Sequence, residues 1–454
     1  GNVALGWQAL KGANHADADN NVAIGANAMD GIGANGAAYN IGIGADALGG
    51  SLTGDFNIAI GQAAGDAVTS GTENVLIGHD AGTALLSGAY NVSVGGGAGV
   101  AMTGSSNNVL IGAYAGTAID DVAANGTVAL GTSALAALTS GQYNTALGFE
   151  ALGTLVDGHR NTAIGYQAMG DTNSGTTADG SEDNIFIGAY AGAGAWANAE
   201  SNKNVSIGNY TMDAVLNGAL QNVAIGYQSA SSLTEGDNNV FIGYGAGDEI
   251  TTGVANVIIG AVAGSHNIQS ETASENVIIG TYADTSATNS SNQIAIGYDC
   301  TCTGNSTATL GISGNTASIA LNGSATTWSS ASSDERYKEN IETSTAGLSF
   351  VNDLRPVTYN WKKEKDVPSD MPAYKEGSDK PVLGHEYGTT LHGFIAQEVK
   401  VAIESHSEIK EGFGMWIERD NGVQTISDGT LVPILIKAVQ ELSQQVEDLK
   451  AKIN

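Results

Sequence analysis

Short apolar segments recur along the first two thirds of the chain, each framed by a leading Asn and a closing Gly. Residues 74–78, 108–112, 184–188 and 256–260 are four examples. Eighteen closing glycines lie between Gly6 and Gly311, and nine of their seventeen gaps are 17 residues long. A fixed period of this length is typical of a solenoid, in which each repeat contributes one stacked unit.

Each position of the repeat has its own physical interpretation. The first and third residues between Asn and Gly are mostly Val, Ile or Leu, and they share one face of a strand. The middle residue varies widely, so we expect it to face a less demanding environment. The closing Gly predicts a tight turn or a positive φ. The leading Asn is placed to form a hydrogen-bonded ladder with the Asn of the next repeat.

The predicted fold is therefore mainly β, with a repetitive parallel β-roll or β-helix shaft over residues 1–323. About eighteen coils of ~17 residues would stack into a rod roughly 85 Å long, and stacking would supply the core. The repeat resembles the β-roll heads of trimeric autotransporter adhesins and fibrous phage tail shafts. A motif-level resemblance implies architecture more than function.

The end of the chain follows a different period. Apolar residues alternately three and four apart form a heptad seam: Val432, Leu435, Val439, Leu442, Val446, Leu449 and Ile453. This seam predicts a coiled-coil helix over residues 430–454, and taken alone it favours a parallel dimer. A second helix is expected within residues 393–405, where Ile395, Val399 and Ile403 share one face.

Charge divides the chain near residue 330. Residues 1–332 contain three cations and 26 acidic residues, whereas residues 333–454 contain 14 cations and 21 acidic residues. The net charge of −30 argues against nucleic acid and anionic membrane surfaces as partners. No apolar run reaches the roughly 18 residues of a membrane span. We therefore expect a linker at 324–332 and a separate domain at 333–429.

Four motifs follow in order after this break, at residues 331–341, 354–362, 392–399 and 431–439. As a set they resemble the C-terminal intramolecular chaperone of phage endosialidases and tail spikes. The resemblance implies a small α+β domain that drives trimerisation and then cleaves itself off. It also favours a homotrimer over the dimer that the heptad pattern alone indicates.

The first motif carries the candidate chemistry. Ser333 is followed five positions later by Lys338, which allows a Ser-Lys dyad if the pKa of the lysine is lowered. The resemblance implies cleavage of the Ser332–Ser333 bond, with Ser333 as nucleophile and Lys338 as base. We assign Asp334 and Arg336 a positioning role. The predicted activity is a single-turnover autoproteolysis, with no enzyme for an external substrate evident.

Other side chains suggest binding rather than catalysis. Tyr114, Tyr166, Tyr190, Tyr227 and Tyr244 sit just past closing glycines, where they could pack between chains or stack sugars. The polar insertion at 170–183 could hold Ca²⁺ but lacks a recognised loop pattern. Cys300 and Cys302 lack a metal or redox spacing, and free thiols are expected over an inter-chain bridge. No cofactor and no metal site is predicted.

These patterns predict a phage tail fibre or tail spike, assembled in the host cytoplasm and carried on the virion tail. Its expected partners are two further copies, a host cell-surface receptor that could be a glycan, and other tail proteins. Because Gly1–Gly6 begins inside a repeat, we expect the tail proteins to bind through an upstream region. A bacterial trimeric surface adhesin and a glycan-depolymerising tail spike are the alternatives.

Overall fold

The protein is described here by a computed structural model. It describes residues 1–13, 17–32, 36–120, 122–172, 180–266, 271–313, 315–322, 329–330, 335, 338–382, 388–409, 413–418 and 422–453. The chain divides into two compact units, Gly1–Ser333 and Asp334–Asn454. We call the first the shaft and the second the C-terminal unit, and each is described by itself.

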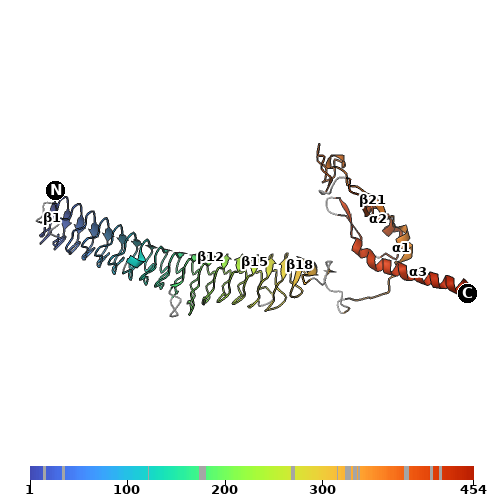
Figure 1. Ribbon diagram of the computed structural model, residues 1–454, viewed down its shortest axis with the longest axis horizontal. Coiled ribbons are helices and arrows are strands. Elements are labelled where there is room, and N and C mark those ends of the chain that lie inside the picture. The colour runs from blue at the N-terminus through green and yellow to red at the C-terminus, as the bar shows by residue number, and fades with distance from the viewer. Residues whose placement is uncertain are drawn as a thin grey trace. The chain divides into compact units, whose positions relative to one another are not determined.

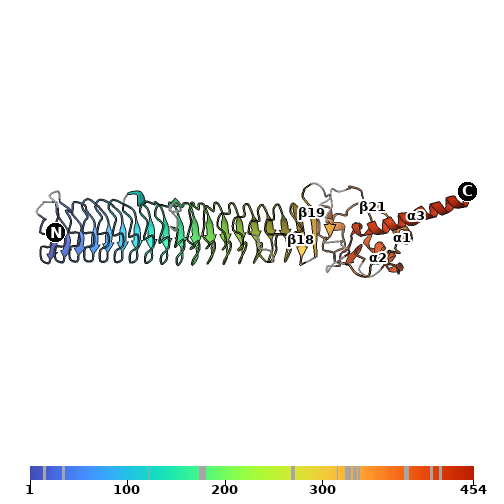
Figure 2. The same cartoon turned by 90° about the horizontal axis from the view of Figure 1, so that it is seen from below.

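The shaft is a parallel β-solenoid whose coils stack along one axis (Figures 1 and 2). Among the described residues, β1 to β18 are joined in chain order by seventeen parallel pairings, which confirms the predicted fold. The strands are β1 Val3–Leu5, β2 Val22–Ile24, β3 Ile41–Ile43, β4 Ile58–Ile60, β5 Val75–Ile77, β6 Val92–Val94, β7 Val109–Ile111, β8 Val128–Leu130, β9 Thr145–Leu147, β10 Thr162–Ile164, β11 Ile185–Ile187, β12 Val205–Ile207, β13 Val223–Ile225, β14 Val240–Ile242, β15 Val257–Ile259, β16 Val277–Ile279, β17 Ile294–Ile296 and β18 Thr307–Ile312. A short 3-10 helix, η1 Val122–Ala124, precedes β8.

From β2 to β17, the middle residue of each strand is buried in the core, so our expectation for this position was wrong. Leu76 and Phe186 are fully buried, whereas the flanking residues are partly exposed. The middle residue varies because other residues of the coil compensate for its size. A Cβ on Gly42 would lie 2.9 Å from Cγ of Met29, and one on Gly192 would lie 2.4 Å from the Phe186 ring. The first and third residues therefore form an outward apolar face.

The closing glycines are required by both conformation and space. Gly95 has a φ of +141°, which confirms the predicted positive φ and strains any L side chain. A Cβ on Gly95 would lie 2.4 Å from the carbonyl oxygen of Gly112 in the next coil. The same approach recurs at the closing glycines of successive coils, so the coils touch backbone to backbone.

The predicted asparagine ladder is confirmed. Asn74 donates from its backbone N and from Nδ2 to Oδ1 of Asn57, at 3.2 and 3.0 Å, and Nδ2 also donates to the carbonyl of Gly88 at 2.9 Å. Buried asparagines repeat this position along the shaft: Asn21, Asn40, Asn57, Asn74, Asn91, Asn108, Asn144, Asn161, Asn184, Asn204, Asn222, Asn239, Asn256 and Asn276. Thr127 interrupts the ladder, and its buried Oγ1 has no hydrogen-bond partner among the residues that the structure describes.

The shaft ends in a change of strand direction. β18 pairs antiparallel with β19, Asn315–Ala320, which pairs antiparallel with the two-residue strand β20, Ser329–Ser330. Cys300 and Cys302 lie buried just before this hairpin as free thiols. Burial raises the pKa of Cys302 to about 12. Their burial agrees with free thiols and leaves neither sulfur at the surface of this chain.

The C-terminal unit is a small α+β structure. Its elements are α1 Leu348–Asp353, β21 Val357–Tyr359, η4 Glu364–Asp366, β22 Leu391–Gly393, α2 Ala396–Ser405, β23 Trp416–Glu418, β24 Gln424–Ile426, η6 Asp428–Leu431 and α3 Val432–Ile453. Its core contains Phe350 of α1, Val399 of α2 and Ile434 of α3. Of the helices in the described ranges, none has the length and apolarity needed to cross a membrane.

Candidate functional site

The predicted cleavage site lies mostly outside the described residues. Ser332, Ser333, Asp334 and Arg336 all fall there, so the dyad stays a prediction. Lys338 is described and exposed, and its backbone N donates to the carbonyl of Glu335 at 3.0 Å. A lysine acts as a general base at neutral pH only when burial or nearby positive charge lowers its pKa. The rest of the C-terminal unit shows how the other motifs meet.

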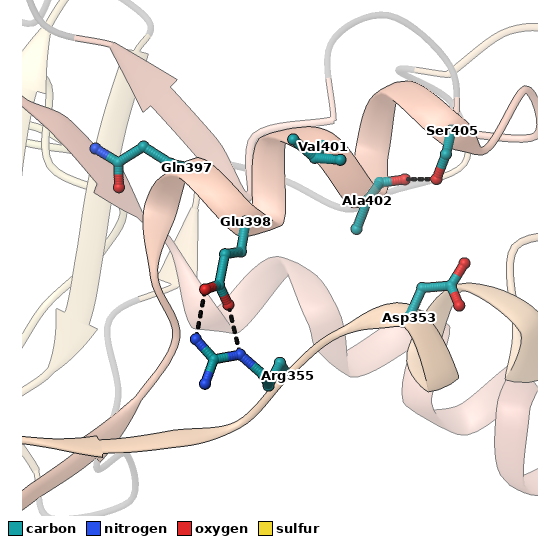
Figure 3. Close-up of a pocket in the computed structure, with 7 residues that line it drawn as sticks. All are labelled: Asp353, Arg355, Gln397, Glu398, Val401, Ala402 and Ser405. Carbon is teal, nitrogen blue, oxygen red and sulfur yellow. Dashed lines mark hydrogen bonds and ion pairs between the residues drawn. The ribbon is translucent and has the colours of Figure 1, made fainter.

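The second and third motifs lie side by side. β21 pairs antiparallel with β22, with Val357 opposite Gly393. Just outside this pair, Arg355 binds Glu398 through two hydrogen bonds, one of them from Nε to Oε2 at 2.9 Å (Figure 3). This bond raises the pKa of Arg355 and lowers that of Glu398. Because both side chains are largely exposed, the pair fixes orientation more than it adds stability.

Two hollows flank this junction of motifs. One has a volume of about 550 Å³ and is lined by Asp353, Arg355, Gln397, Glu398, Val401, Ala402 and Ser405. Figure 3 shows the Arg355–Glu398 pair in this hollow, with the carboxylate of Asp353 carried by the end of α1. The other, of about 510 Å³, is lined by Pro356, Val357, Thr358, His392, Gly393, Phe394 and Asp428. Neither hollow contains the predicted nucleophile or base.

A buried histidine joins the ends of α1 and α2. His406 Nε2 lies 2.8 Å from Oδ2 of Asp353, and Nδ1 lies 2.6 Å from Oε1 of Glu408. The ring packs edge-on against Phe350. The hydrogen bond with Asp353, reinforced by Glu408, raises the pKa of His406. Because a carboxylate lies within hydrogen-bond distance of each nitrogen, the protonated ring is favoured and both ring nitrogens are occupied.

The fourth motif forms α3, which has two differently used faces. Ile434 and Ala438 are buried against the core, and Oε2 of Glu441 accepts a hydrogen bond of 2.8 Å from the backbone N of Leu348. That bond satisfies one free N–H at the start of α1. The heptad residues lie on the other face, and Leu442 is 50 % exposed. In one chain the entire seam therefore faces solvent.

Sequence reasoning missed the residues that tie the C-terminal unit together. Arg355 lies in the second motif and Glu398 in the third. Their presence in these two motifs was the one sequence feature that could have pointed to them. Asp353, His406 and Glu441 carry no local pattern, because their partners lie 53 and 93 residues away in the chain. Spacing along the sequence does not report such contacts.

Acidic side chains form no cation site within the described ranges, where no group of three or more His, Cys, Asp or Glu is placed to hold a metal ion. Glu182 and Asp183 instead bind Arg160 of the preceding coil, each at 2.6 Å. Much of the 170–183 insertion, residues 173–179, lies outside the described residues.

Comparison with known proteins supports the motif assignment. Residues 333–407 match the family model described as chaperone of endosialidase. The match begins at Ser333 and spans the second and third motifs. No curated protein matches the chain. Together with the long β-solenoid, the family match fits a tail fibre or tail spike that carries an endosialidase-type chaperone at its C-terminus.

Proposed function

We propose that the chain forms the trimeric shaft of a phage tail fibre or tail spike that attaches to the host surface. Its C-terminal unit brings three copies together, promotes folding of the shaft and then cleaves itself off between Ser332 and Ser333. The observation that carries this proposal is the chaperone match at residues 333–407 directly behind a long solenoid.

Two apolar surfaces of the single chain support assembly with further copies. The outward face of the shaft carries the first and third strand residues, such as Leu147, which is 41 % exposed. The α3 seam adds a second exposed row, from Val432 to Ile453. Monomeric proteins rarely expose apolar surface on this scale. Within its own unit, each surface is a row of apolar residues at repeated positions along the length of that unit. Such a row allows copies of the chain to pack side by side along it.

A chaperone role follows from the slow formation of contacts between the shafts of different chains. Contacts between the shafts of separate chains are non-local, so they nucleate slowly. A C-terminal coiled coil would tether three chains and raise the effective concentration of their shafts. Once the tether is removed, the folded shaft would persist because unfolding is slow.

Cleavage can be written as two balanced steps. Ser333 Oγ attacks the carbonyl carbon of Ser332 while Lys338 takes the hydroxyl proton. The bond between that carbon and the backbone N of Ser333 then breaks as Lys338 returns the proton to the nitrogen, which leaves an ester and a free amine. Water then hydrolyses the ester, which releases the C-terminal unit with Ser333 at its start. Because Lys338 is exposed in one chain, we infer that neighbouring chains bury it and that cleavage follows assembly.

The test compares cleavage in five chains, the wild type and four variants, by denaturing gel and mass spectrometry. Wild type should yield a fragment that begins at Ser333, and Ser333→Ala or Lys338→Ala should abolish it. Leu442→Asp disrupts the exposed seam and leaves both residues of the predicted dyad unchanged, so it should leave the chain uncleaved and monomeric. Ser330→Ala serves as a matched control and should cleave normally. A wild-type chain that folds into trimers yet stays intact would refute the dyad, and full cleavage of a monomeric Leu442→Asp chain would refute its coupling to assembly.

A further inference from the structure

A row of aromatic rings runs along six successive coils of the shaft. Each ring lies one or two residues after a closing glycine, and the row comprises Phe149, Tyr166, Tyr190, Tyr210, Tyr227 and Tyr244. Neighbouring ring centroids are 5.2 to 5.8 Å apart at every step. We call this row the aromatic ladder.

The ladder is stiff, and its geometry follows the sequence position of each ring. Rings at equivalent positions stack nearly parallel, as Tyr227 does on Tyr244 with an interplanar angle of 5°. Where the ring moves from the first to the second position after glycine, between Tyr166 and Tyr190, the contact becomes edge-to-face at 67°. Stacked tyrosines have few free torsions, so a ligand would bind them at little entropic cost.

The rims of the rings reach solvent beside polar side chains. The exposed fraction is 46 % for Tyr166 and 57 % for Tyr244. Gln167 follows Tyr166 and donates from Nε2 to Oε2 of Glu150 at 2.6 Å, and Gln228 follows Tyr227. The strip therefore offers apolar ring surface and hydrogen-bonding groups together, which is the combination that pyranose rings and their hydroxyls use.

The length of the aromatic ladder distinguishes between two interpretations: a strip that binds a ligand and a seam between chains. The outward face formed by the first and third strand residues runs from β1 to β18, as an inter-chain seam would. The continuous ladder covers six coils. At the same positions, the coil before it carries Thr132 and Ser133 and the coil after it carries Ala261 and Val262, while Tyr282 and Tyr298 form a separate pair further along. Tyr166 and Tyr190 share a side-chain hydrogen bond, but the phenolic hydroxyls of Tyr210, Tyr227 and Tyr244 would also need partners in a dry seam, and leaving them unpaired there would be costly. A hydrated, hydroxyl-rich partner avoids that cost.

Charge narrows the class of partner. Residues 148–247 contain two cations, Arg160 and Lys203, and ten acidic residues. Arg160 is already bound by Glu182 and Asp183. An anionic polymer would be repelled along this part of the shaft, whereas an uncharged polymer would not.

We propose that the aromatic ladder binds an extended, uncharged polysaccharide lying along the shaft axis. This inference rests on the proposed attachment function and adds the chemical class of the receptor. The sugar rings would lie against the exposed rims of the aromatic rings and beside the edge-to-face contacts between them. The side-chain amides of Gln167 and Gln228 would form hydrogen bonds with the sugar hydroxyls.

The experiment measures retardation of the cleaved shaft in native gels that contain one polysaccharide each. Dextran, mannan and linear β-glucan are the uncharged probes, and hyaluronate and polysialate are the anionic probes. We expect an uncharged polymer to retard the wild-type shaft, and the double variant Tyr190→Ala/Tyr210→Ala to weaken binding about tenfold or more. Tyr90→Ala/Tyr143→Ala is the matched control, because both tyrosines are exposed and stand just before the leading Asn of their repeats, a different position from that of the ladder rings. It should bind as wild type does.

Each other outcome overturns the inference. It fails if no uncharged polymer retards the wild-type shaft, or if only the anionic polymers do. It also fails if the ladder variant loses its trimeric mass, because the ladder would then be a seam. Tyr190→Phe/Tyr210→Phe keeps both rings, so it should keep the trimer and lose only part of the affinity. Binding of labelled shaft to host cells is measured in parallel: equal binding by wild type and ladder variant refutes the ladder as receptor site and leaves the attachment function standing.

Discussion

The shaft and the C-terminal unit are stabilised in opposite ways. In the shaft, most coils repeat the same backbone contact and the same Asn bond to the next coil, as between Asn57 and Asn74. In the C-terminal unit, single bonds join distant segments, as between Leu348 and Glu441. A damaged coil should therefore affect its neighbours first. Loss of one distant bond should loosen the whole small unit at once.

The largest effect that we expect is Gly95→Ala in the shaft. The added Cβ would meet the carbonyl oxygen of Gly112 at 2.4 Å, and the φ of +141° is unfavourable for alanine. We expect a loss of at least about 4 kcal/mol of stability, seen as loss of protease-resistant shaft. Gly96→Ala is the matched control, because the nearest atom to its Cβ would be the carbonyl oxygen of His79, 4.0 Å away. Equal behaviour of the two variants would contradict the close-contact argument.

Asn239→Ala should have the next largest effect. Oδ1 of Asn239 accepts bonds from the backbone N and Nδ2 of Asn256, and its own Nδ2 donates to the carbonyl of Gly253. Alanine would leave these buried groups without partners, at a cost of about 2–3 kcal/mol. Thermal unfolding of the purified shaft measures the loss. Thr127→Ala removes a hydroxyl that already has no partner, so it should cost clearly less.

The smallest effect is a pH dependence confined to the C-terminal unit. The pKa of His406 is raised above its ordinary value of 6.5 in the folded unit. Its stabilising contribution is therefore complete below about pH 6.5 and is lost as pH rises through the folded pKa. Denaturant unfolding of the released unit should show a lower midpoint at pH 8 than at pH 6. His406→Gln should flatten this dependence, and an unchanged slope would show that another group controls it.

The sequence predicted the shaft better than the C-terminal unit for a physical reason. Each coil is specified within about 17 residues, so period, closing glycines and the Asn ladder could be inferred from repetition. The buried middle residue was misjudged because its size is balanced by residues elsewhere in the coil, as Met29 balances Gly42. The contacts of Glu441 and His406 depend on chain folding over long separations, and no repeat reveals them.

The antiparallel hairpin at the end of the shaft has a consequence for how long fibres can grow. The last strand of a parallel solenoid presents open N–H and C=O groups that can template strands from other molecules. Here β19 occupies that edge of β18, and the two-residue β20 pairs with the far edge of β19. These strands precede Ser332–Ser333, so they would remain on the shaft after cleavage. The shaft thus carries its own stop against head-to-tail polymerisation, and its length is set by the number of coils in one chain.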